Sequence, residues 1–358
     1  MSAGGARVEA AAPSPLSWEQ GKRAVASLPR LEVQLLIGLL LIYLAFSIAE
    51  PDIFPTDRTF ENLARQWGIL LVVGVGQMLV LVVGGFDISV GANVGFTSTA
   101  LALLIDDLGV TGAVAAAIAL GGAVGLVNGV IVAGLGVNPF VTTLAMLTFL
   151  TGLSNELSNG ASVPISDPGL RPYGATDWGP IPATTGIALI VLVLAYVLLN
   201  RLRPGLYIYA IGGNRETARL SGIAVPRYEV LAYAVCGLFA GAAGVMLASR
   251  VSVGQASLGA GLELQSIAAA VIGGAAIGGG HGRLLGVALG VAILTVLTSG
   301  LEIVGVSEFT RNMVTGVVLV VAVVFNQRRR LGLWGIPKGI ASQLERLRGA
   351  RSSRRQSK

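Results

Sequence analysis

Long apolar runs recur along this chain and constrain its fold more than any other feature. The chain has 358 residues, of which 53% are hydrophobic and 12% are charged, whereas an ordinary soluble domain carries about 25% charged residues. An apolar run of about 20 residues is long enough to cross a bilayer as a helix. The sequence therefore predicts an all-α, polytopic membrane protein.

The hydropathy pattern predicts about ten transmembrane helices and two flanking tails. Residues 1–30 are predicted to form a disordered cytosolic tail, residues 31–326 a transmembrane domain, and residues 327–358 a basic cytosolic tail. The first 30 residues lack the apolar core and cleavage site of a signal peptide. The predicted spans are 33–49, 68–85, 90–105, 111–134, 139–155, 184–200, 230–249, 262–279, 284–304 and 310–326.

The distribution of basic residues predicts the orientation. With the N-terminus in the cytosol, 20 of the 25 Lys and Arg residues fall in the tails and the cytosolic loops, in agreement with the positive-inside rule. An even number of spans then places both termini in the cytosol. The net charge of +6 comes from residues that flank spans, so it does not indicate nucleic-acid binding. The basic tail is predicted to lie against anionic lipid, or to be a solvated anchor of topology.

Motifs that carry enzyme chemistry are missing from the sequence. Cys236 is the only cysteine and His281 the only histidine, which excludes an intramolecular disulfide and disfavours the common metal sites. There is no P-loop, no Gly-x-Ser-x-Gly elbow and no His-Glu-x-x-His motif. We therefore predict no catalytic residue, no metal ligand and no cofactor in this chain.

One polar point interrupts the apolar sequence between the second and third predicted spans. Residues 84–91 read Gly-Gly-Phe-Asp-Ile-Ser-Val-Gly. A charge at the bilayer centre costs about 2.5–3.5 kcal/mol on insertion scales, and such residues usually face a protein interior or a watery path. We predict that Asp87 lines a translocation path or gate and shares a hydrogen-bond network with polar neighbours. These neighbours are Gln77, Ser89, Asn93 and Asn128.

The polar point also has a purely structural interpretation. Asp87 or Ser89 could cap the helix that follows, a role typically worth about 1 kcal/mol. Two further residues are candidates for the path. Pro139 follows Asn138 and opens the fifth span, where a first-turn proline is tolerated. Glu263 lies near the outer end of the eighth span, and its alternative role is an ion pair with Arg250.

Glycines are spaced by four residues in two of the predicted spans, which favours tight helix packing. The two ladders are Gly121, Gly125 and Gly129, and Gly282, Gly286 and Gly290. A weak internal echo also exists, because Gly84-Gly85 is followed by Gly91 and Gly273-Gly274 is followed by Gly280. The echo suggests a repeat of the same orientation.

The cytosolic loop 201–229 is long for this chain and carries both signs of charge. Residues 212–214 read Gly-Gly-Asn and predict a turn. Asn214 is then predicted to cap a short helix over 215–221 that ends at Gly222. A short helix on the cytosolic face has the form of a docking surface, and a plain solvated connector is the alternative.

Four ordered blocks between about residues 35 and 326 resemble the permease subunits of ribose-type ABC sugar importers. The octet is similar to that family's Gly-Gly-Ile-Asp-Leu-Ser-Val-Gly element. Residues 138–144 resemble its Pro-Phe-Ile-x-Thr-Leu stretch, residues 209–223 its cytosolic loop, and residues 263–274 a fourth block. The sequence departs from the family at Leu206, where a basic residue is common, at Gln265, where an acid is common, and at Phe86.

The resemblance implies a sugar importer of several subunits in a bacterial inner membrane. Two permease copies, identical or paralogous, would form the pore, and a solute-binding protein would deliver the sugar from outside. A separate ATPase would bind ATP and Mg²⁺ and dock on the cytosolic loop. The implied docking residues are Gly205, Tyr209, Ala210, Gly212, Gly213, Asn214, Ala218, Ser221 and Gly222.

An ion-coupled secondary transporter of a small polar solute is the alternative function. Such transporters also use broken helices and polar residues at the midplane of the membrane. Few acids are embedded in the predicted spans, chiefly Asp87 and Glu263, which disfavours proton coupling.

Overall fold

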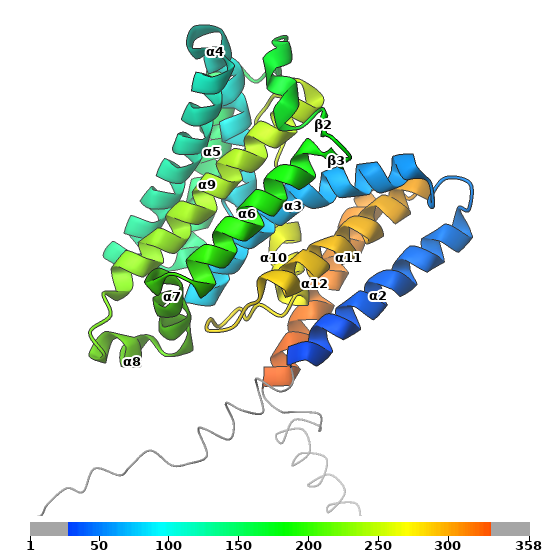
Figure 1. Ribbon diagram of the computed structural model, residues 1–358. Coiled ribbons are helices and arrows are strands. Elements are labelled where there is room, and N and C mark those ends of the chain that lie inside the picture. The colour runs from blue at the N-terminus through cyan, green and yellow to red at the C-terminus, as the bar shows by residue number, and fades with distance from the viewer. Residues whose placement is uncertain (1–27, 331–358) are drawn as a thin grey trace, which may run out of the picture.

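The computed structural model describes residues 28–330, and most of this part of the chain is helical (Figure 1). The predicted tails therefore lie almost entirely outside the described residues. The α-helices are α2 Leu28–Ala49, α3 Asp57–Val83, α4 Val90–Gly129, α5 Pro139–Leu157, α6 Ala183–Asn200, α7 Arg203–Gly213, α8 Arg215–Leu220, α9 Val225–Val251, α10 Leu262–Ile272, α11 Leu284–Ile303 and α12 Glu308–Arg330. A π-helix, η1 Val130–Gly134, extends α4, and a 3₁₀-helix, η2 Pro168–Tyr173, follows α5.

Short strands join loops at one end of the helices, opposite the end that carries α7 and α8 (Figure 1). The strands are β1 Val163–Pro164, β2 Asp177–Trp178, β3 Ile181–Pro182 and β4 Val253–Gly254. β1 pairs antiparallel with β4, and β2 with β3. In the first pair Val163 lies opposite Gly254, so that the loop after α5 is tied to the loop after α9.

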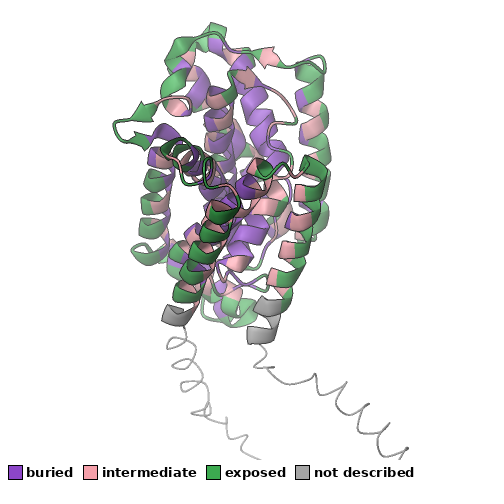
Figure 2. Ribbon diagram, turned by 90° about the vertical axis from the view of Figure 1, so that its right-hand side faces the viewer, coloured by how far each residue is buried: buried purple, intermediate pink, exposed green. Residues whose placement is uncertain are grey.

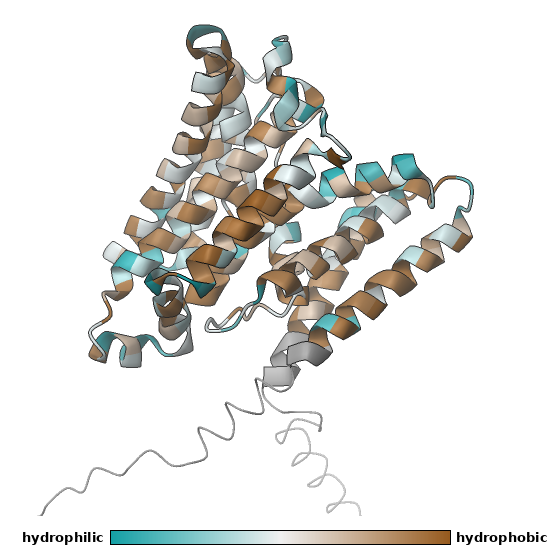
Figure 3. Cartoon of the chain, viewed as in Figure 1, coloured by the Kyte–Doolittle hydropathy of each residue, from teal (hydrophilic) through white to brown (hydrophobic). Residues whose placement is uncertain are grey.

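Helix α3 lies at the centre of the helical layer. In Figure 1, α4, α5 and α9 lie to one side of it and α2, α11 and α12 to the other. The apolar window of α3 is 89% buried, whereas that of α2 is 6% buried, a contrast that the burial colouring in Figure 2 also shows for core and outer helices. The outer helices carry apolar side chains on exposed faces (Figure 3). Such a surface suits a bilayer, whose acyl chains are as apolar as leucine.

Within residues 28–330, six helices are long and apolar enough to cross a membrane, so the predicted count of ten spans is not confirmed. One of the six, α4, is a folded-back pair. Gly109 has φ 65° and ψ 170°, which breaks the helix. Asn93 Nδ2 donates to the carbonyl of Gly121 over 3.1 Å, although a straight helix would separate these residues by about 42 Å. The two antiparallel halves match the predicted spans 90–105 and 111–134.

Three boundaries differ from the sequence prediction. The predicted span 262–279 is shorter, because α10 ends at Ile272; its 11 residues reach about 16 Å, half of a bilayer core. Helix α3 begins at Asp57 rather than at residue 68, because Thr56 caps a polar first turn that hydropathy assigns to a loop. The loop 201–229 is mostly helical, since α7, α8 and the first turn of α9 occupy it.

A row of small buried residues on the second half of α4 and on η1 faces α9, and we call it the small-residue row. Its members recur every four residues: Ala113, Ala117, Gly121, Gly125, Gly129 and Ala133. A Cβ atom on Gly121 would lie 2.6 Å from the carbonyl oxygen of Gly237. Backbones therefore touch directly here, and the predicted tight packing of the first glycine ladder is confirmed.

The second glycine ladder is also confirmed as a packing surface. Gly286 lies against the backbone of Gly273, and Gly290 lies against the carbonyl of Ala269. Gly282 packs instead against the side chains of Val82 and Met78.

Helices α3 and α10 end with the same hydrogen-bond pattern. Gly84 has φ 94° and Gly274 has φ 90°, a left-handed conformation that glycine adopts without steric cost. Both ends have the paired bonds of a Schellman-type cap. The four N–H to carbonyl bonds run from Gly84 to Leu81, from Gly85 to Val80, from Gly274 to Val271 and from Ala275 to Ala270. The correspondence supports the internal echo seen in the sequence.

Candidate functional site

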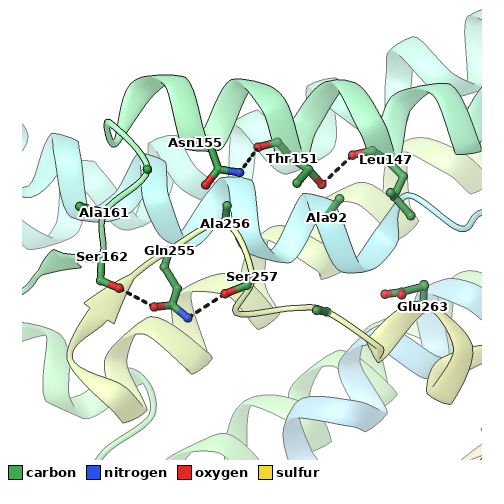
Figure 4. A pocket seen from close by; sticks show the side chains of 12 residues that line it. Ala92, Leu147, Thr151, Asn155, Ala161, Ser162, Gln255, Ala256, Ser257 and Glu263 are labelled. Atoms are coloured by element: carbon green, nitrogen blue, oxygen red, sulfur yellow. Dashed lines mark hydrogen bonds between the residues drawn. The ribbon is translucent and has the colours of Figure 1, made fainter. Parts of the chain in front are cut away.

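A polar pocket of about 300 Å³ lies between α5, the start of α4 and the loop that joins β4 to α10 (Figure 4). Its lining residues are Ala92, Leu147, Thr151, Asn155, Gly160, Ala161, Ser162, Gln255, Ala256, Ser257, Ala260 and Glu263. The pairing of β1 with β4 brings its two walls together, because β1 follows Ser162 and β4 precedes Gln255.

Glycines hold the β4–α10 loop against α4. A Cβ atom on Gly91 would lie 2.6 Å from the carbonyl oxygen of Gly259, and one on Gly95 would meet the backbone of Ala256. Only glycine permits this close approach. Because non-helical backbone at membrane depth is tolerated where it lines a cavity or is buried in protein, the loop and the half-length helix α10 fit a position beside a polar pocket.

The polar groups on one wall of the pocket are held by hydrogen bonds. Ser162 Oγ donates to Gln255 Oε1 over 2.6 Å, and Gln255 Nε2 donates to Ser257 Oγ over 2.9 Å (Figure 4). On the opposite wall, Asn155 Nδ2 donates to the carbonyl of Thr151 over 2.8 Å. The Gln255 amide is thus fixed from both ends, and the Asn155 side chain bonds only to its own helix in the part of the chain that the structure describes.

Glu263 is the charged residue of the pocket lining. Its Oε1 accepts a hydrogen bond from the Gly261 N–H over 3.2 Å, and its carboxylate lies against Gly91. The alternative ion pair with Arg250 does not form, and Glu263 makes no ion pair with any residue in 28–330. Its carboxylate therefore stays available to whatever fills the pocket.

Asp87 lies in a separate, buried network. Its Oδ1 accepts from the Ser89 N–H over 2.8 Å and from Ser89 Oγ over 2.6 Å, and Asn128 Nδ2 donates to Ser89 Oγ over 2.9 Å. Asp87 is 3% exposed. The bond to the Ser89 N–H forms an Asx-turn that ends one residue before α4, and neither Asp87 nor the Ser89 side chain accepts a hydrogen bond from an N–H of α4 itself. The structure thus brings Asp87, Ser89 and Asn128 together, with the acid in an Asx-turn ahead of the helix.

The side chains of the other predicted network residues make no hydrogen bond to Asp87 within residues 28–330. Asn93 bonds to Gly121 across the α4 hairpin, and the amide of Gln77 has no partner among the described residues although it is fully buried. Pro139 opens α5 as expected, with Asn138 Oδ1 accepting from the Phe140 N–H over 2.9 Å. Of the predicted path residues, Glu263 lines the pocket in this conformation.

A tyrosine that sequence reasoning missed holds the linker between α3 and α4. The hydroxyl of Tyr233 accepts from the Phe86 N–H and donates to the Phe86 carbonyl, each over 3.1 Å. Thr143 Oγ1 accepts from the Ile88 N–H over 3.2 Å. The backbone on either side of Asp87 is therefore tied to α9 and to α5.

The cytosolic helices form a second candidate site. Asn214 caps α8 by accepting from the Thr217 N–H over 2.9 Å, and Gly222 has φ 83° beyond the helix end, as expected. The predicted turn at residues 212–214 is wrong in part, because Gly212 and Gly213 belong to α7 and the chain turns at Asn214. Arg219 hydrogen-bonds Glu216 and lowers the pKa of that exposed carboxyl, so Glu216 stays ionised at neutral pH.

The predicted docking residues divide into two faces. One group is exposed: Ala210, Gly213, Asn214, Ser221 and Gly222. The other group is buried or half-buried against the rest of the chain: Gly205, Tyr209, Gly212 and Ala218. The exposed group can meet a partner, and the inward group positions α7 and α8.

Helix α7 contacts both helix breaks. A Cβ atom on Gly212 would meet the carbonyl of Val82 at the end of α3 and the N–H of Gly280 in the α10–α11 linker. The Gly280 N–H donates to the Val82 carbonyl over 2.8 Å, and the Tyr209 hydroxyl donates to the carbonyl of Gly282 over 2.7 Å. A displacement of α7 would therefore act on the ends of α3 and α10 together.

Comparison with known proteins identifies the family. The family model described as "Branched-chain amino acid transport system / permease component" matches residues 59–323. The chain belongs to this family of transport permeases. No solved structure gives a significant match to the permease.

Similar permeases come from several bacteria. The ribose import permease protein RbsC of Escherichia coli K12 is 35% identical over 317 residues, which covers 87% of this permease and 98% of the relative. RbsC of Bacillus subtilis is 34% identical, with 82% and 92% covered. The L-arabinose ABC transporter permease protein AraH of Azospirillum brasilense is 35% identical, with 81% and 86% covered.

Most pocket residues of the permease were not singled out from the sequence. The hydroxyl and amide groups on residues 151–162 and 255–257 carry no motif and lie about 100 residues apart. One sequence signal points to them. The glycines at 254, 259 and 261 interrupt an apolar region, and short or glycine-broken apolar segments mark binding sites in transporters.

Proposed function

We propose that this permease is the membrane-spanning subunit of an ATP-driven ABC importer whose solute is a sugar, a pentose, a hexose or a related polyol. The carrying observation is the likeness to ribose and L-arabinose permeases over more than four fifths of the chain. The family description names branched-chain amino acids, and we give the curated relatives more weight because they match over almost their whole length. Family membership also disfavours the ion-coupled alternative.

The importer would need partners that supply energy and substrate. A cytosolic ATPase would bind ATP and Mg²⁺, because the permease sequence has no P-loop. A solute-binding protein would deliver the sugar, and a second permease, identical or paralogous, would complete the pore in a bacterial inner membrane. The positive-inside rule supports cytosolic termini and places α7 and α8 on the ATPase side.

In this proposal the ATPase acts on the membrane helices through α7. The exposed residues of α7 and α8 receive the ATPase, and the inward residues transmit the displacement. Gly212 lies against the end of α3 and against Gly280, so a shift of α7 reaches the linker that holds Asp87. The same shift reaches α10, whose first turn carries Glu263 into the pocket.

Reconstitution tests the function directly. Proteoliposomes that contain the permease, its ATPase and its binding protein should accumulate sugar only with ATP. The permease alone should not transport, with or without a proton or sodium gradient. Gradient-driven uptake by the permease alone would establish the secondary transporter instead.

A docking variant tests the surface that we assign to the ATPase. Gly213 has open space around it, so Gly213→Arg should fold, yet it should lose co-purification with the ATPase. Gly213→Ala is the matched control and should keep both. Ala218 is a poor probe, because it is 4% exposed and a larger side chain would disturb packing. Co-purification of Gly213→Arg at the parent level would remove this surface from the proposal.

A further inference from the structure

The pocket between α5 and the β4–α10 loop has an unusual charge pattern for a place that holds a solute. Its polar lining consists of hydroxyls, amides and one carboxylate, and no Lys, Arg or His of the described chain lines it. We propose that this pocket is a solute site within the permease itself, that it takes a neutral polyhydroxylated solute, and that Glu263 excludes anions from it. The proposal rests on the proposed function only for its place in transport.

The size and the fixed polar groups of the pocket favour a small hydroxyl-rich molecule. A volume of about 300 Å³ lies at the lower end of small-molecule pockets. The Gln255 amide is held between Ser162 and Ser257, so its orientation is set before a ligand arrives. Asn155 Oδ1 has no partner within residues 28–330 and remains an acceptor, and it faces the Gln255 wall across the pocket (Figure 4).

The Glu263 carboxylate can both attract hydroxyl groups of a solute and repel anionic groups. A carboxylate accepts hydrogen bonds from hydroxyl groups and forms stronger bonds than a neutral acceptor. It has one bond, from Gly261, and no cation partner among residues 28–330. A phosphate or carboxylate on the solute would bring a second negative charge into a cleft with low-dielectric walls, where repulsion is weakly screened. The site therefore selects by repulsion as well as by contact.

The charge pattern also distinguishes a sugar from an amino acid. A site for an amino acid must satisfy the α-carboxylate, and guanidinium groups are well suited to this. The pocket offers no such group, and its carboxylate lies on α10 near the start of α4. A neutral polyol needs no counter-charge and can bond to every polar group of the lining.

Thiol labelling of the purified full-length chain in detergent tests the site without ATPase or transport. Cys236 is 1% exposed, so a cysteine at an exposed pocket position is the accessible thiol among the described residues. Asn155→Cys places it on one wall, and Ala260→Cys places it on the other. At Ala260→Cys, three residues before Glu263 in the chain, we expect a cationic methanethiosulfonate to react faster than an anionic one by roughly two- to five-fold, from one unit charge within about 10 Å.

Matched acid variants locate the source of this bias. Glu263→Gln in the Ala260→Cys chain should abolish it, whereas Glu156→Gln should leave it, because Glu156 lies on α5 and does not line the pocket. A bias that survives Glu263→Gln overturns the charge assignment. If Glu263→Gln does not fold, equal rates of the two reagents at Ala260→Cys overturn it instead.

Protection by solutes tests the ligand class. D-ribose, L-arabinose or xylitol at high millimolar concentration should slow labelling of Asn155→Cys at least about three-fold, and ribose 5-phosphate and L-leucine should not. Protection by L-leucine or by ribose 5-phosphate equal to that by the neutral polyols overturns the proposal. Failure of all three neutral polyols also overturns it. Neither result bears on the ATP-driven transport assay, so the two proposals fail separately.

Discussion

The two helix breaks of this permease, residues 84–89 and residues 273–283, begin alike and are held differently. Both start with a left-handed glycine and the same pair of backbone bonds. The first break is fixed by side chains of the membrane helices, chiefly Tyr233 and Thr143. The second is fixed by α7, through the backbone contact of Gly212 and the hydroxyl of Tyr209, and near the first break Gly212 also meets the carbonyl of Val82 just before it. A repeated local structure thus serves as an internal joint in one place and as a cytosolic connection in the other.

The largest expected effect comes from filling the contact at the second break. Gly212→Val adds a side chain where the backbone atoms of Val82 and Gly280 already lie, and backbone cannot move aside as a side chain can. We expect little folded, monodisperse protein after detergent extraction, and transport near background. Gly213→Ala is the control, since a Cβ there meets open space. A melting temperature for Gly212→Val within a few degrees of the parent would show that α7 does not press on the break.

The stability of the first break should depend on the hydroxyl group of Tyr233. Tyr233→Phe leaves the N–H and the carbonyl of Phe86 without their partner, which costs about 1–3 kcal/mol when such groups are buried. Thermal unfolding in detergent should show the loss. Tyr228→Phe on the same helix is the control, because its hydroxyl has no hydrogen-bond partner in the part of the chain that the structure describes. Equal melting of the two variants would contradict a special role for Tyr233.

Two substitutions of Asp87 distinguish the role of its hydrogen bonds from the role of its negative charge. Asp87→Ala removes the acceptor of two Ser89 bonds and should lower the free energy of unfolding by about 1–3 kcal/mol. Asp87→Asn keeps an acceptor oxygen and should fold nearly as well as the parent. Sugar uptake then decides the function. Full transport by Asp87→Asn would mean that the hydrogen bonds to Ser89 are sufficient, and a folded but inactive Asp87→Asn would place the charge in the transport cycle.

The smallest effect on stability is expected from removing the hydroxyl of Tyr209, which bonds to the second break. Tyr209→Phe loses one half-buried bond, to the carbonyl of Gly282, and a typical bond of this kind contributes about 0.5–1.5 kcal/mol. We expect a small drop in melting temperature and reduced coupling of ATP hydrolysis to uptake. A drop larger than that of Tyr233→Phe would reverse the comparison between the two breaks.

Local features of the fold were predictable from the sequence. The cap at Asn214, the first-turn position of Pro139 and the packing of the glycine ladders follow from short-range rules, and the structure confirms them. The length of α10 was not predictable in this way. Apolar residues continue past Ile272, so hydropathy extends the helix, whereas the conformation of Gly274 and the contact of Gly273 with Gly286 end it.

The pocket could not be predicted from the sequence for a related reason. Its walls come from residues near 155 and near 257, which meet because β1 pairs with β4 through only two residues each. Strands this short leave no period to detect. Asp87 attracted attention because an acid is rare in an apolar chain, whereas the serines, the amide and the glycines of the pocket are ordinary residues. Glu263 was found because it is charged.

The small-residue row on α4 and η1 affects how the sequence encodes the alignment of its helices. Its members recur every four residues, close to one turn, so a neighbour displaced by a turn would meet almost the same surface. Bulky side chains that interdigitate normally fix how far one helix is shifted along another, and this surface has almost none. Contacts outside the row must therefore fix the alignment of α9. The Tyr233 hydroxyl bonds to Phe86, and Ser249 Oγ donates to the carbonyl of Leu170 over 2.7 Å. One hydroxyl group in each half of α9 thereby distinguishes among alignments that the row itself leaves almost equal.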